Sequence, residues 1–418
     1  MSLWAFRFLL WFIVVAYVQP QNRFEFLNSV HLADISGMGA IGLHVMSAAR
    51  EGRPFIRFGP CTILCLAIMT CGLIAQYTGA LQTDPTWNYD IDMLIKTCVV
   101  GILVEAMAFT NERVWAIQAT LLVALLWWIK AGLRLSSAGA TYMGDRIMGP
   151  AVSMIENPNG YAYLTAVYIP LFFYFYRQER RFLWKLGYGF LIFAGIFIVL
   201  QTGSRTGLIC LLVMGAFTIP MLAVAERKFL IIAVIGIYIV IGAVSKGNIE
   251  RFKSIRYAVN SFIMGKPSRA NSEEDKNTVE RYYRNKHTWN LIKMYPLGTG
   301  MNPNPDLMPA EVGFATGKSH MEILMAGRMM GFPGMFLYLL MLAIPFIKGR
   351  QIQRTMAHHM PGLSDLGWLF KIQAAIFLTG GLFVPNPFIY PETIMLGCAS
   401  ALSLNTSSSP EPSPAAPG

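Results

Sequence analysis

The residues best suited to chemistry lie in short polar segments between long apolar blocks. The first segment, 201–207, reads Gln-Thr-Gly-Ser-Arg-Thr-Gly. Arg205 falls where a helix is expected to begin, and the backbone N–H groups at a helix start favour an anion. Ser204 and Thr206 add hydroxyl donors. The segment therefore suits anion binding, with an interfacial anchor as the alternative, because arginine side chains often snorkel from helix ends.

A second segment, 280–284, reads Glu-Arg-Tyr-Tyr-Arg. Arg281 and Arg284 are three residues apart, so on a helix they share one face. A guanidinium is planar and always charged, and it can bind two oxygens of one phosphate. Arg281 is therefore a candidate phosphate ligand. For Arg284 we favour the alternative, which is a solvated basic face.

The third segment, 318–322, reads Lys-Ser-His-Met-Glu and comes shortly before an apolar block. An imidazole takes up a proton near neutral pH, so His320 is a candidate general base. Glu322 is a nearby side chain that could support it. A structural role is the alternative, since a single histidine in a loop usually has one.

A fourth polar segment contains Asp145, Arg146 and, further along, Asn159. These side chains suit a polar substrate, and equally the asparagine suits a turn or a helix cap. We find no dinucleotide-binding loop, no phosphate-cradling Gly-Lys loop and no zinc-ligand spacing. We therefore expect neither a cofactor nor a metal.

The elements that must position these residues are membrane helices. The chain is 54% hydrophobic and only 14% charged, whereas soluble domains carry about 25% charged residues. Its apolar blocks reach the roughly 20 residues that a helix needs to cross a bilayer. We predict an all-α integral membrane protein of about twelve transmembrane helices. The blocks lie near 3–19, 30–49, 60–82, 91–110, 114–135, 160–176, 184–201, 205–224, 228–245, 330–347, 366–384 and 388–404.

Loop charges predict the orientation of these spans. Alternate short loops are rich in Lys and Arg, which is typical of cytoplasmic loops, and this accounts for the formal charge of +11 without nucleic acid. The N- and C-termini are then cytoplasmic, and one large loop, 246–329, lies outside. Within it, Thr278 to Met294 is predicted to be helical. The membrane domain is expected to span 1–404, followed by a disordered cytoplasmic tail, 405–418.

This orientation places Arg205, Arg281 and His320 on the same outer side of the membrane. Cations at a membrane–water boundary suit the diphosphate of a lipid-linked substrate. A neighbouring base suits a hydroxyl nucleophile.

On these residues the chain resembles the O-antigen ligase family, which shares its membrane domain with O-antigen polymerases. The resemblance covers roughly 150–350. It rests on Ser204-Arg205-Thr206-Gly207, on Arg281 through Pro296-Leu297-Gly298-Thr299-Gly300, and on Ser319-His320 followed by Met330-Gly331. The stretch from Asp145 to Asn159 also looks like the one preceding the core of exosortase-associated ligases. The chain departs from the family pattern at Met321, where Asn is frequent, and at Asn285, where an aromatic residue is usual.

The resemblance implies a C-type (GT-C-like) glycosyltransferase in the bacterial inner membrane. Such an enzyme is metal-independent and inverting, and it moves a glycan from undecaprenyl pyrophosphate to an acceptor hydroxyl in the periplasm. Carried over to this chain, Arg205 and Arg281 would hold the pyrophosphate and His320 would activate the acceptor. The acceptor could be lipid A core, a protein or another glycan.

Two alternatives remain at this stage. A polymerase that extends the glycan on its own carrier would share the donor chemistry and differ only in the acceptor. A multi-pass transporter is less favoured. Transporters often carry midplane charges and paired repeats, whereas here the informative cations lie at one surface and we find no repeat.

Overall fold

The computed structural model describes residues 1–22, 24–28, 30–81, 89–139, 146–150, 156–222, 273–302, 319–384 and 387–407. These residues form helices and no strand. The N-terminal helices are α1 (Ser2–Val18), α2 (Glu25–Asn28), α3 (Leu32–Glu51), α4 (Pro60–Thr78), α5 (Tyr89–Met107) and α6 (Asn111–Ser137). The others are α7 (Pro158–Gln178), α8 (Phe182–Gln201), α9 (Arg205–Thr218), α13 (Glu273–Met294), α14 (Glu322–Thr355), α15 (Pro361–Gly380) and α16 (Tyr390–Ser407).

Eleven of the twelve predicted spans fall on these helices, and the ninth, 228–245, lies outside the described residues. Five helices are long and apolar enough to cross a membrane, namely α3, α4, α6, α8 and α14, and α1 and α9 are shorter apolar helices. The chain is therefore a helical, multi-pass membrane protein. Two boundaries differ from the prediction. Helix α14 begins at Glu322, before the expected 330, and α16 continues to Ser407, so Asn405 belongs to a helix rather than to the tail.

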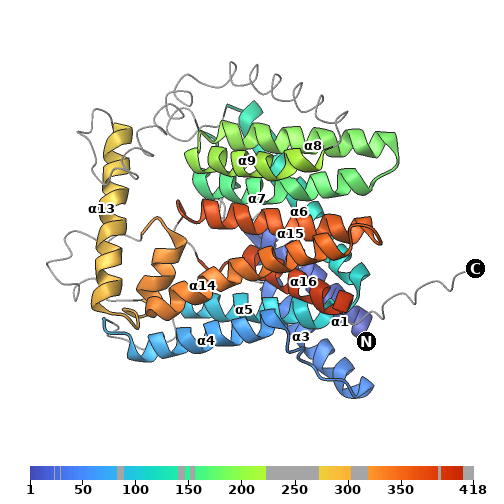
Figure 1. Cartoon of the computed structure of the whole chain (residues 1–418), viewed down its shortest axis with the longest axis horizontal. Coiled ribbons are helices and arrows are strands. Elements are labelled where there is room, and N and C mark those ends of the chain that lie inside the picture. The colour runs from blue at the N-terminus through green and yellow to red at the C-terminus, as the bar shows by residue number, and fades with distance from the viewer. Residues whose placement is uncertain are drawn as a thin grey trace, which may run out of the picture.

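The long helices run roughly parallel to one another, and α13 stands across one end of the bundle (Figure 1). We call this end the α13 end. The N-terminus lies at the other end, which we call the opposite end (Figure 1). Helices α7, α8 and α9 form one side of the bundle, α14, α15 and α16 its middle, and α1, α3, α4 and α5 its other side.

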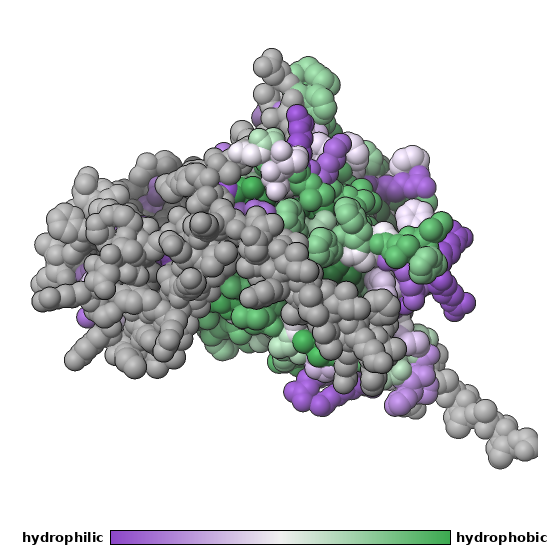
Figure 2. Space-filling view, turned by 90° about the horizontal axis from the view of Figure 1, so that it is seen from above, coloured by the Kyte–Doolittle hydropathy of each residue, from purple (hydrophilic) through white to green (hydrophobic). Residues whose placement is uncertain are grey.

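The surface between the two ends suits lipid. Leu183 and Phe190 on α8 are 79% and 61% exposed, as expected for side chains that meet acyl chains rather than water. In the space-filling view, apolar residues cover much of the visible described surface, and polar residues gather toward the right-hand end (Figure 2). The remaining part of the predicted large loop, 246–272 and 303–318, lies outside the described residues, as does the tail from 408.

Helix α14 is interrupted near the α13 end, and the segment after α13 forms the hydrogen bonds that the interrupted backbone lacks. Gly331 has φ 68° and ψ −159°, a conformation that a side chain would strain. Pro333 has no N–H to continue the helix ladder. The orphaned carbonyl of Arg328 accepts from Thr299 N at 2.8 Å, and the N–H of Phe332 donates to Pro296 O at 2.9 Å. The segment after α13 thus satisfies the interrupted backbone of α14, which lipid could not do.

Candidate functional site

The turn that carries His320 is held by α13. Asn285 Oδ1 accepts hydrogen bonds from Ser319 Oγ at 2.8 Å and from His320 N at 3.3 Å. Ser319 Oγ in turn accepts from Met321 N at 3.2 Å. The sequence had singled out Asn285 only as a departure from the family pattern. The structure shows that its amide oxygen fixes the backbone beside the candidate base.

Arg281 and Arg284 lie close enough to His320 to change its titration. Burial, then the charges of Arg281 and Arg284, lower the pKa of His320 to about 4, while Glu280 opposes them. Glu280 also forms an ion pair with Arg284. The imidazole is therefore neutral at pH 7. Of the predicted site residues, the structure thus brings Arg281, Arg284 and His320 together.

The two remaining candidate segments meet each other at the same end. Arg146 Nε donates to Thr202 O at 2.7 Å, and its Nη2 donates to Asn159 Oδ1 at 2.8 Å. Asn159 N donates to the Asn157 side chain, which caps α7. The stretch around Arg146 therefore packs against the loop that leads into Arg205. Asp145 lies outside the described residues.

The sequence around Arg205 builds a capped and tightly packed helix start. Ser204 Oγ accepts from Gly207 N at 3.3 Å, which is an N-cap bond. A Cβ at Gly207 would lie only 2.7 Å from Ala162 Cβ, so glycine lets α9 approach α7. Ser204 and Thr206 are buried, whereas Arg205 is half-buried. The Ser204 hydroxyl therefore supports the helix start, and Arg205 is the more exposed neighbour of the two buried residues.

Contacts through α7 connect the segment around Arg205 with the turn that carries His320. Gly207 faces Ala162, and the next residue, Tyr163, places its hydroxyl 3.3 Å from Glu322 Oε2. Glu322 follows the His320 turn and begins α14. Arg205, Arg281 and His320 thus share the α13 end of the bundle. No group of three His, Cys, Asp or Glu residues in the described part of the chain could hold a metal ion.

Glu322, expected to support His320, instead points into the helical core. Its side chain is fully buried and accepts from the hydroxyl of Tyr338. The same hydroxyl lies 3.1 Å from Glu392 Oε1 on α16. The sequence had not singled out Glu392 or Tyr338, because a glutamate inside an apolar block carries no spacing signal.

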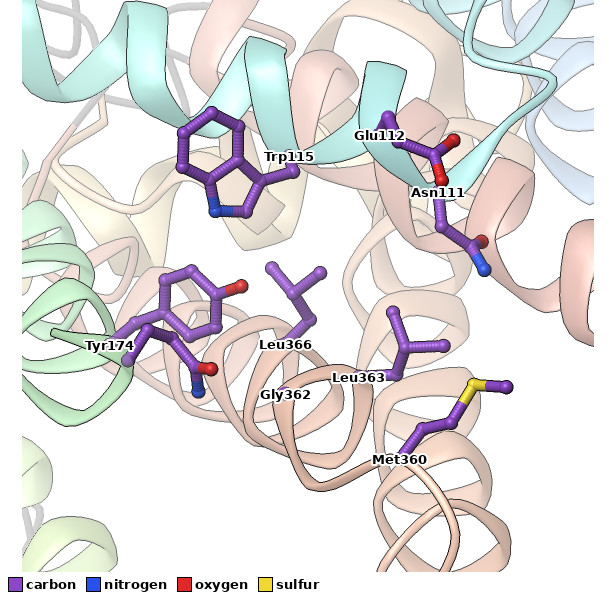
Figure 3. A pocket seen from close by; sticks show the side chains of 9 residues that line it. Asn111, Glu112, Trp115, Tyr174, Met360, Gly362, Leu363 and Leu366 are labelled. Atoms are coloured by element: carbon purple, nitrogen blue, oxygen red, sulfur yellow. The ribbon is translucent and has the colours of Figure 1, made fainter. Parts of the chain in front are cut away.

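A surface pocket of about 360 Å³ lies away from these residues. Figure 3 shows it between the start of α6, the end of α7 and the start of α15, all at the opposite end. Trp115, Tyr174 and Leu366 give it a mainly apolar lining, and Glu112 lies at its edge. Its position separates it from the candidate site.

Comparison with known families decides the class of the protein. Residues 189–339 match the family described as O-antigen ligase. The chain contains an O-antigen ligase domain. This domain extends from within α8 to within α14, so it includes Arg205, Arg281 and His320. A comparison with curated proteins finds no match.

The O-antigen ligase domain implies glycosyltransferase activity in a multi-pass membrane protein. The break in α14 at Gly331 and the segment that follows α13 both fall inside the matched range. The Ser-Arg-Thr-Gly motif, the Asn285–Ser319 contact and the His320 turn are all parts of one O-antigen ligase domain.

Proposed function

We propose that this protein transfers a glycan from undecaprenyl pyrophosphate to an acceptor hydroxyl at the periplasmic face of the bacterial inner membrane. The observation that supports this most is the neutral imidazole of His320 beside Arg281, inside the O-antigen ligase domain. The acceptor is lipid A core, a protein or another glycan.

The proposed reaction needs a charge stabiliser and a base. The acceptor oxygen forms a bond to the anomeric carbon, and the bond from that carbon to the phosphate oxygen breaks, with inversion. Arg205 and Arg281 offset the charge that develops on the leaving pyrophosphate, which is often the largest catalytic term in a partly dry site. His320 takes the proton from the acceptor hydroxyl. These residues supply the chemistry without calling on a metal.

The depressed pKa of His320 keeps the imidazole neutral at pH 7 but makes it a weak base until the donor binds. A base that is already neutral at pH 7 does not have to lose a proton before it can act. Binding of an anionic diphosphate would offset the charge of Arg281 and so raise the pKa of His320. The imidazole would then hold the acceptor's proton more readily once the donor is in place.

The proposed topology has twelve spans, cytoplasmic termini and a periplasmic α13 end. It is supported by the alternation of cation-rich loops and by the shared position of α13, the start of α9 and the His320 turn. A polymerase that extends a glycan on its own carrier would use the same donor residues. The acceptor alone separates that reaction from ligation.

Three substitutions test the site. Arg205→Ala, Arg281→Ala and His320→Ala should each abolish glycan transfer while the protein remains inserted in the membrane. Arg205→Lys and Arg281→Lys should also be severely impaired, because an ammonium cannot replace a bidentate guanidinium. Arg180→Ala is the matched control, since Arg180 is exposed at the opposite end. Full transfer by all three alanine variants would refute the assignment.

A further inference from the structure

Two glutamates meet inside the helical core next to the His320 turn. Glu322 on α14 and Glu392 on α16 are both fully buried. The hydroxyl of Tyr338 lies between them, hydrogen-bonded to Glu322 and 3.1 Å from Glu392 Oε1. Buried acids in a membrane domain are costly, and those that occur usually have a function.

The donors around Glu322 are too few for an ionised carboxylate that lies beside a second one. The single proton of Tyr338 can go to only one of the two glutamates. The hydroxyl of Tyr163 has one proton for Glu322 Oε2, at 3.3 Å, and for Phe377 O, at 3.2 Å. Glu392 Oε2 accepts from Ile389 N at 3.1 Å, and the backbone N–H of Phe388 is a second, weaker donor to this carboxyl group. Glu322 Oε1 is buried and has no hydrogen-bond partner.

No positive charge compensates the pair among the described residues. The titratable groups that face it are Tyr163 on α7, Cys210 on α9, Tyr338 on α14 and, toward Glu392, Tyr168 on α7. None of these is a cation. Two adjacent carboxylates in a low-dielectric core repel each other, and the usual solution is to keep a proton.

We propose that Glu322 and Glu392 form a proton-binding site that retains at least one proton at neutral pH. A protonated Glu392 can donate to the oxygen of Tyr338, whose own proton then goes to Glu322. In this series of hydrogen bonds from Glu392 through Tyr338 to Glu322, every bond then has one donor and one acceptor. The proton thereby joins α14 to α16 through Tyr338, and Tyr163 adds α7.

The proton-binding site holds the turn that carries His320 in place, and the importance of this for catalysis rests on the proposed function. Glu322 N donates to Gly381 O at 2.7 Å, so the first residue of α14 is fixed to the segment after α15. His320 lies two residues earlier in the chain. Loss of the proton would place two negative charges at this junction and push the start of α14, with His320, away from its neighbours. Glu322 and Glu392 are positioning residues in this scheme.

Infrared spectroscopy of the full chain in nanodiscs tests the proton directly. A protonated carboxyl group has a C=O stretching band that an ionised carboxylate lacks, and the band shifts in D2O. At pH 7 we expect this band in the unmodified protein and its loss in the double variant Glu322→Gln/Glu392→Gln. Glu105→Gln is the matched control, because Glu105 is equally buried but accepts from three backbone N–H groups, which suit a negative charge. Its spectrum should keep the band.

Two outcomes would overturn the proposal. One is a spectrum without the band in the unmodified protein, above all if its thermal stability then depended on Na⁺ or K⁺, which would indicate a bound cation instead. The other is a band that persists in the double variant. The infrared result does not depend on glycan transfer, so a failure of the proposed function leaves it readable.

Activity separates positioning from simple folding. Glu392→Gln keeps a donor toward Tyr338 and should retain most of the transfer activity, whereas Glu392→Ala should lower kcat more than it changes KM for the donor. Equal losses in both variants, at equal amounts of folded protein, would argue against the positioning role.

Discussion

The two ends of the helical bundle treat their buried charges in different ways. At the opposite end, Glu105 accepts hydrogen bonds from Gly59 N, Cys61 N and Thr62 N at 2.9–3.2 Å, and from the hydroxyl of Ser400. Its carboxylate therefore caps the start of α4 and joins α5 to α16. The N–H groups at a helix start suit a negative charge, so this carboxylate is satisfied within the fold.

Two arginines at the opposite end are also hydrogen-bonded within the fold, although Thr62 Oγ1 and Asn111 Oδ1 are buried there without a partner. Arg113 donates to Met107 O and to Ser2 Oγ, both at 2.9 Å. Arg57 donates to Asn405 Oδ1 at 2.9 Å, and the amide of Asn405 donates to Ala108 O. These bonds join the ends of α1, α5 and α16 to the loops beside them.

The α13 end leaves buried polar atoms without a protein partner. Glu322 Oε1 has none, and neither has Nε of Arg328, whose residue is only 8% exposed. His320 lies beside Arg281 and Arg284, which disfavour its protonated form. The buried carboxylate of the opposite end is thus hydrogen-bonded through both oxygens, whereas at the α13 end one oxygen of Glu322 has no partner.

The largest expected effect tests the catalytic role of His320 at the α13 end. His320→Ala should lower the rate of glycan transfer by about 10²–10⁴-fold, the usual contribution of one positioned base. The variant should unfold at nearly the same temperature as the unmodified protein. The measurement is transfer to acceptor by membranes that contain equal amounts of each protein. A rate within a few-fold of the original would place the base elsewhere.

The second largest expected effect tests the structural role of Glu105 at the opposite end. Glu105→Gln removes the charge that three N–H groups and one hydroxyl share, so it should lower the free energy of unfolding by about 2 to 3 kcal/mol. Thermal unfolding in detergent micelles measures the loss, with Glu51→Gln as an exposed control at the same end. Transfer per folded molecule should be kept. A specific loss of transfer in folded Glu105→Gln protein would break the division between the two ends.

A smaller effect concerns the contact between α13 and the His320 turn. Asn285→Ala removes the acceptor of Ser319 Oγ and His320 N, and one such hydrogen bond is worth roughly 1 kcal/mol. We expect up to a tenfold fall in kcat, with KM for the donor little changed. Asn285→Asp keeps an acceptor oxygen and should restore part of the rate. No difference between the two variants would contradict the positioning role.

The smallest effect is a shift in pH dependence. Arg284 helps to lower the pKa of His320 to about 4, so Arg284→Gln should move that pKa upward. Because a base must be neutral to act, the acidic limb of the kcat/KM profile should move to higher pH. At neutral pH the change in rate should be small, since the imidazole stays mostly unprotonated. An acidic limb that does not move would show that another group controls it.

The sequence by itself determined the helices of the described part of the chain and the family that its central part resembles. Long apolar blocks specify membrane helices because burial in lipid depends on local composition, and eleven of the twelve blocks fall on described helices. The helix over Thr278–Met294 was also predicted and lies within α13. Motifs around Arg205, Arg281 and His320 led to the O-antigen ligase resemblance, and the matched range confirms it.

Only the tertiary structure decided which of these residues meet. Asn285 contacts a turn more than thirty positions later, and Thr299 satisfies the break in α14 at Arg328. The Glu322–Glu392 pair forms because two helices pack side by side, and a single glutamate in an apolar block does not reveal its neighbour. Composition and spacing report local preferences along the chain. Partners of buried polar groups are set by packing between distant segments, which a single sequence does not encode in any local pattern.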